Sequence, residues 1–125
     1  MTRSPEMSAT VRRALDERWP RVYEASRAHF ATIEAFSNAG DRANLAQRLA
    51  ARSASHKLSG SLGMFGRRDA SSVAAAIEDL LAIDESIVGG TGLSDAHAAM
   101  PADAQSELRA LVDKLDGLIS LDPAG

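Results

Sequence analysis

Residues 41–66 read DRANLAQRLAARSASHKLSGSLGMFG, and they predict a helix with two very different faces. Asp41 is a good N-cap residue and Gly66 can end a helix in the left-handed conformation, so a helix is predicted over residues 41–65. On an ideal wheel, at about 100° per residue, five apolar side chains share one arc. They are Ala51, Ala54, Leu58, Leu62 and Phe65. This arc predicts a helix that buries one face against other helices.

The opposite face of the same helix carries His56. The residues around it on the wheel are Leu45, Leu49, Arg52, Gly60 and Gly63. A glycine inside a helix costs roughly 1 kcal/mol relative to alanine. Because helical side chains lean toward the N-terminus, a larger residue at position 60 would lean over His56. The two glycines therefore predict an imidazole that a large partner can approach, although they could instead permit close helix packing.

An imidazole in this setting suits phosphoryl transfer. Much of the group is neutral, and therefore nucleophilic, at cellular pH. Transfer itself depends mainly on positioning and on neutralising charge. Leu45 and Leu49 would form an exposed apolar landing site for a partner, unless they pack under the connection before the last helix or under the first helix.

The rest of the chain has helical periodicity. Pro20 ends a short first helix over residues 5–19, and a second helix follows over residues 20–37. Further helices are predicted over residues 69–88 and 101–121, with apolar residues at spacings of three and four. The fold class expected is all-α: an antiparallel up-and-down four-helix bundle with a short N-terminal capping helix.

Length and composition limit the classes of protein. The 125 residues suit one domain over residues 1–125, and Met1 and the short length favour a free-standing domain. A net charge of −3 argues against nucleic-acid binding. The chain has no cysteine, and its three scattered histidines do not have metal-site spacing, so no metal site is expected. Without a signal peptide or a membrane-spanning apolar run, the chain is expected to be cytoplasmic.

Residues 56–66, HKLSGSLGMFG, resemble the phosphohistidine signature of histidine-containing phosphotransfer (HPt) domains. That signature has a histidine, an apolar residue two positions later, a lysine, a glycine, a small residue, and then a further apolar position and glycine. The matching residues are His56, Leu58, Gly60, Ser61, Phe65 and Gly66. Val73, Ile77 and Glu78 match the usual continuation in the next helix.

The resemblance implies a phosphorelay intermediate that works without kinase activity of its own. It would accept a phosphoryl group on His56 from a receiver-domain aspartate, or from a histidine kinase, and pass it to another response regulator. It implies no cofactor on this chain, because Mg²⁺ belongs to the partner receiver, and a monomer is the family's usual state. The alternative is an HPt-like binding module that sequesters a receiver or kinase without phosphotransfer.

One position departs from the family pattern, because Ser59 stands where the signature has lysine. That lysine would offset the phosphoryl charge. The residues expected to stabilise the phosphoryl group here are Arg52, Lys57 and Ser59, with Arg52 preferred because it lies one turn before His56. The expected docking surface comprises Leu45, Leu49, Gly60, Gly63 and Arg67. Arg67 would attract an acidic receiver cleft, unless it belongs to a solvated turn.

Overall fold

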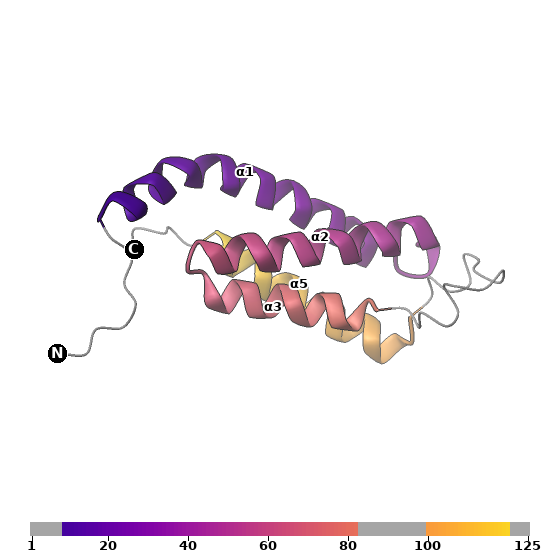
Figure 1. Cartoon of the computed structure of the whole chain (residues 1–125). Coiled ribbons are helices and arrows are strands. Elements are labelled where there is room, and N and C mark those ends of the chain that lie inside the picture. The colour runs from indigo at the N-terminus through magenta and orange to yellow at the C-terminus, as the bar shows by residue number, and fades with distance from the viewer. Residues whose placement is uncertain (1–8, 83–99, 121–125) are drawn as a thin grey trace.

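The computed structural model describes residues 9–82 and 100–120, which form four long helices packed side by side (Figure 1). In chain order they are α1 (Ala9–Ala39), α2 (Leu45–Met64), α3 (Arg68–Leu80) and α5 (Ala102–Ile119). Successive helices run in opposite directions, and α1 and α3 each pack against both α2 and α5. The predicted all-α antiparallel four-helix bundle is confirmed. No helix in the described ranges has the length and apolar character that a membrane crossing requires.

One apolar core lies between the helices and receives a stripe of side chains from each. The contributions of α1 and α2 are Phe30, Ile33, Phe36, Ala51, Ala54, Leu58 and Leu62. The contributions of α3 and α5 are Ala70, Val73, Ala74, Ile77, Leu108, Val112, Leu115 and Ile119. The predicted core arc of α2 is therefore buried, except that Phe65 at its end is only half-buried. The face of α2 that carries His56 points away from this core.

The prediction of a separate capping helix over residues 5–19 is wrong. α1 is one helix of 31 residues with Pro20 inside it, so the helix predicted over residues 20–37 is its second part. Proline inside a helix costs about 3 kcal/mol, because it removes a hydrogen bond and crowds the preceding turn. Here the apolar stripe stays in phase across Pro20, from Leu15 to Val22, and the Trp19 ring packs 5.6 Å from that of Phe65. Tertiary packing outweighs the local preference for a break.

The ends of α2 differ slightly from the prediction. Asp41 belongs to a short 3₁₀ helix (Gly40–Arg42), and the N-cap of α2 is Asn44. The Asn44 side chain accepts from the Gln47 N–H at 2.8 Å, and the Gln47 side chain accepts from the Asn44 N–H at 2.9 Å. This reciprocal capping box stabilises the first turn. At the other end Gly66 has φ 77°, a left-handed conformation that favours glycine, as predicted.

The third helix of the bundle also ends earlier than predicted. α3 ends at Leu80, where the prediction over residues 69–88 continued. Arg48 of α2 donates from Nε to the Leu81 carbonyl and from Nη2 to the Ala82 carbonyl, both at 3.1 Å. These bonds satisfy carbonyls at the end of α3, and burial lowers the pKa of Arg48. The predicted boundaries at residues 5, 88 and 121 lie outside the described residues.

Candidate functional site

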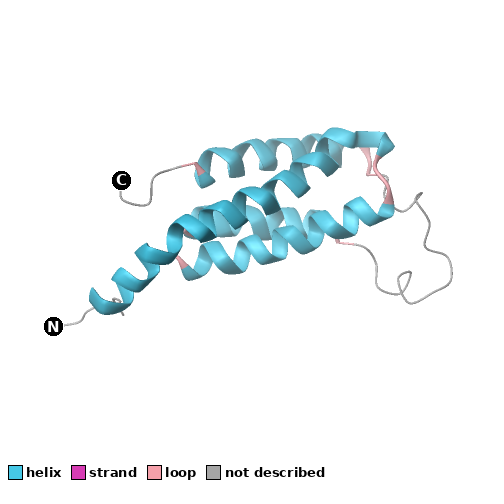
Figure 2. Cartoon of the chain, turned by 90° about the horizontal axis from the view of Figure 1, so that it is seen from above, coloured by secondary structure: helices cyan, strands magenta, loops and turns pink. Residues whose placement is uncertain are grey.

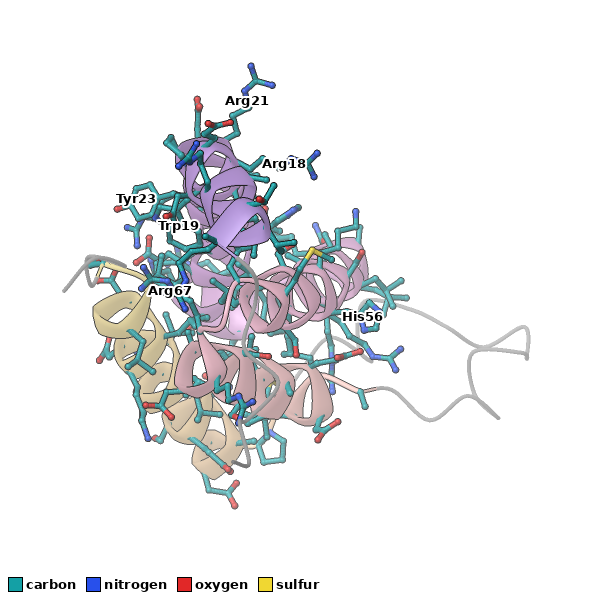
Figure 3. All side chains as sticks on the ribbon, turned by 60° about the vertical axis from the view of Figure 1, so that its left-hand side comes forward. Arg18, Trp19, Arg21, Tyr23, His56 and Arg67 are labelled. Atoms are coloured by element: carbon teal, nitrogen blue, oxygen red, sulfur yellow. The ribbon has the colours of Figure 1, made fainter. Side chains whose placement is uncertain are left out.

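His56 lies on the outer face of α2, and 76% of its side chain is exposed (Figure 3). Its position follows from the helical repeat, because the neighbouring Ser55 and Leu58 are turned inward and fully buried. Gly60, one turn later, has nothing within 4 Å of the place where a Cβ would stand. The absence of a side chain there leaves open space beside the imidazole rather than allowing a close helix contact.

Glu78 of α3 holds one edge of the His56 ring. The Nδ1 atom lies 3.0 Å from Oε2 and 3.3 Å from Oε1 of Glu78, whose side chain is 25% exposed. An ionised carboxylate can only accept, so Nδ1 carries the proton in this hydrogen bond. In the neutral ring the Nε2 atom then keeps its lone pair. The geometry therefore presents Nε2 as the nucleophilic nitrogen.

An open hollow surrounds this pair. Leu49, Arg52, Ser53, His56 and Glu78 line it. Arg52 lies one turn before His56, and its Nε is buried with no hydrogen-bond partner among the described residues. The described part of the chain also offers its guanidinium no carboxylate within ion-pair distance. Leu49 is 40% exposed, whereas Leu45 is half-buried.

Ser59 and Gly63 face the seam between α2 and α3. The Ser71 hydroxyl of α3 donates to the Ser59 carbonyl at 2.7 Å and lies 3.3 Å from the Ser59 hydroxyl. A Cβ at Gly63 would stand 3.2 Å from the Ser71 Oγ. Gly63 therefore permits close packing of the two helices, which was the alternative interpretation of the glycines. The Ser59 hydroxyl is directed to Ser71.

Two basic residues that the sequence assigned to the site, Lys57 and Arg67, do not line the hollow around His56. Lys57 is exposed on α2, one residue beyond His56. Arg67 is the N-cap residue of α3, and its guanidinium lies 4.3 Å from the centre of the Trp19 ring. In Figure 3, Arg67 and Trp19 lie together on the side of the bundle away from His56. The structure thus groups Leu49, Arg52 and Gly60 with His56 and separates Arg67 from them.

The sequence interpretation did not assign a role to Glu78. It lies 22 positions after His56, and only the packing of α3 on α2 brings the two together. The available signal was its place next to Ile77, which is fully buried, at the edge of the core-facing stripe of α3. In the described part of the chain, no three histidine, cysteine or carboxylate side chains come together as a metal site requires.

The family model for the Hpt domain matches residues 9–118. This range contains α1, α2 and α3 in full and all of α5 except its last residue, Ile119. The chain therefore belongs to the Hpt domain family. Membership assigns it a role in histidine phosphotransfer within phosphorelays, as a phosphotransfer module rather than a typical enzyme. No match was found among curated proteins, and none among solved structures.

Proposed function

We propose that His56 is the phosphoacceptor of this Hpt domain and that it exchanges a phosphoryl group with a receiver-domain aspartate. The observation that carries the proposal is the Nδ1–Glu78 hydrogen bond at 3.0 Å on an imidazole that is 76% exposed. A ring fixed at one nitrogen and open at the other is arranged for attack by Nε2.

The transfer step balances without a proton leaving His56. The Nε2 lone pair forms the N–P bond while the P–O bond to the partner's aspartate breaks, and the aspartate leaves as a carboxylate. The phosphorylated ring retains the Nδ1 proton and gains positive charge. Glu78, 3.0 Å from Nδ1, stabilises that charge as it develops. The reverse step returns the phosphoryl group to an aspartate of another receiver.

Arg52 is the residue best placed to offset the negative charge of the phosphoryl group. It lines the same hollow as His56, and a guanidinium binds phosphoryl oxygens with two parallel hydrogen bonds. Lys57 is a weaker candidate, since it is turned about 100° away on the helix. Ser59 contributes least, because its hydroxyl lies within hydrogen-bond distance of Ser71.

The receiver, from a response regulator or a hybrid histidine kinase, would dock on the outer face of α2. Leu49 and the edge of Leu45 offer apolar contact, and Gly60 leaves room for the approach. The partner would supply Mg²⁺, since carboxylate oxygens are the ligands that Mg²⁺ prefers. We propose that the chain acts in the cytoplasm as a monomer.

The test is phosphotransfer from receiver domains phosphorylated with labelled acetyl phosphate, comparing the chain with His56→Gln. The proposal predicts acid-labile, base-stable label on the chain and none on the variant. If the chain binds a receiver tightly and takes no label, the sequestering module replaces the relay. If the variant takes label as well, the phosphoacceptor is another residue.

A further inference from the structure

The N-terminal arm of α1, defined here as residues 9–21, extends beyond the rest of the bundle (Figures 1 and 2). Trp19 contacts Phe65, which is the C-cap of α2, so residues 9–18 lie past the end of that helix. At 1.5 Å per residue, the projecting part is about 15 Å long. All of its residues are exposed except Leu15, which is half-buried.

The base of the arm is held firmly to the bundle. The Trp19 ring lies 5.6 Å from the ring of Phe65, 6.1 Å from that of Tyr23, and 4.3 Å from the Arg67 guanidinium. These aromatic and cation–π contacts join α1 to the turn between α2 and α3. The arm therefore projects in a direction that the bundle fixes.

The arm carries four arginines and two carboxylates, whereas the whole chain has a net charge of −3. The arginines are Arg12, Arg13, Arg18 and Arg21. Figure 3 shows Arg18 and Arg21 directed away from the bundle, with Arg18 on the same side as His56. This end of the molecule is therefore basic, although the chain as a whole is acidic.

We propose that the arm is a second contact surface for the acidic receiver that docks at His56, an inference that rests on the proposed function. Two copies of this chain that paired arm to arm would bring like charges together, which is unfavourable. An acidic surface on the receiver, next to the face that docks at His56, would complement the arginines of the arm. The receiver is the occupant because, once seated on His56, it extends alongside the arm.

One partner can reach both places. His56 lies about 14 Å along α2 from Phe65, where the arm leaves the bundle. A domain of ~100 residues has a radius of gyration of about 13 Å, so its diameter exceeds ~30 Å. A receiver seated on His56 thus extends alongside Arg18 without any rearrangement of α1.

The experiment uses Arg18→Gln with Arg21→Gln in the full chain. The matched control is Arg109→Gln with Lys114→Gln, which removes the same charge from exposed positions of α5. The rate constant for transfer from a receiver phosphorylated with acetyl phosphate is measured against receiver concentration, in low and high salt. We expect the arm variant to raise the half-saturating concentration roughly fivefold, to keep the saturating rate constant, and to lose part of the salt dependence.

The two proposals fail in different ways. If the arm variant and the α5 control behave alike while the unaltered chain transfers normally, the arm proposal is overturned and the proposed function stands. If the unaltered chain takes no phosphoryl group from any receiver, the proposed function fails. A fall in the saturating rate constant alone would assign the arginines to the transfer step instead of docking, which also contradicts the proposal.

Discussion

Two polar side chains, His56 of α2 and Arg67 at the N-cap of α3, are each held by a neighbouring helix, yet with opposite outcomes. His56 is bound at one nitrogen by the Glu78 carboxylate and is otherwise exposed. Arg67 lies over the Trp19 ring and is half-buried. A polar contact at one edge leaves the imidazole available to a partner, whereas an aromatic face occupies the guanidinium. The group that a neighbouring helix presents decides whether a polar side chain stays accessible to a partner or is used in packing.

The substitution with the largest expected effect distinguishes the role of His56 from that of Arg67. His56→Gln should abolish phosphoryl transfer and change the free energy of unfolding by less than about 1 kcal/mol, because the ring is exposed and surface ion pairs contribute little. The measurements are label incorporation and urea unfolding of the same preparation. A loss of several kcal/mol in stability would show that His56 supports the fold, and the contrast with Arg67 would disappear.

Trp19→Ala should lower the stability of the fold and leave phosphoryl transfer unchanged. Removing the half-buried ring eliminates the contacts to Phe65 and Arg67 and should lower the free energy of unfolding by about 2 kcal/mol, equivalent to a fall in Tm of about 8 °C. Circular dichroism during heating measures this change. At a temperature where the variant is folded, its saturating transfer rate constant should equal that of the unaltered chain; a clear decrease would connect this end of the bundle to the chemistry.

Glu78→Gln tests the contact between the Glu78 carboxylate and the His56 ring. The amide can still accept from Nδ1, but it cannot offset positive charge on the ring. The saturating rate constant for transfer should therefore fall about tenfold, which corresponds to ~1.4 kcal/mol. Rapid-quench kinetics measure it, and Glu78→Asp is the control that keeps the charge. Equal rates for the chain and Glu78→Gln would leave the carboxylate without a role in transfer.

The smallest expected effect concerns Arg52. Arg52→Gln should shorten the lifetime of phosphorylated His56 about threefold, since an ion pair at the protein surface supplies less than about 1 kcal/mol. Lys57→Gln removes one positive charge from the residue next to His56. It should change the lifetime of phosphorylated His56 less than Arg52→Gln does. The loss of label over time at neutral pH gives both values. A larger effect at Lys57 would move the charge partner to that residue.

The sequence predicted what depends on one helix at a time. The apolar arc of α2 predicted its buried face, and the opposite face correctly placed His56 and Gly60 in the open. The sequence could not predict the contact between His56 and Glu78, because that contact depends on how α3 is rotated against α2. For the same reason, Gly63 is predicted on the outer face and Ser59 is predicted to stabilise the phosphoryl group, although both lie at the seam with Ser71.

Pro20 shows a different limit. The local rule that proline ends a helix is sound for an isolated segment, but the cost is a few kcal/mol and tertiary contacts of similar size can offset it. In α1 those contacts come from Trp19 beside Phe65 and Arg67, residues more than forty positions away. Arg67 was likewise assigned to docking from sequence because nothing nearby in the chain indicated its aromatic partner.

The contacts of Trp19 have a practical consequence. It is the only tryptophan of the chain, so all of the indole fluorescence comes from the point where α1 leaves the bundle. Emission from this ring responds to its surroundings, which here include a phenylalanine, a tyrosine and an arginine. The molecule therefore contains its own optical probe, and both the loosening of this end and the arrival of a tryptophan-free receiver can be followed without attaching a dye.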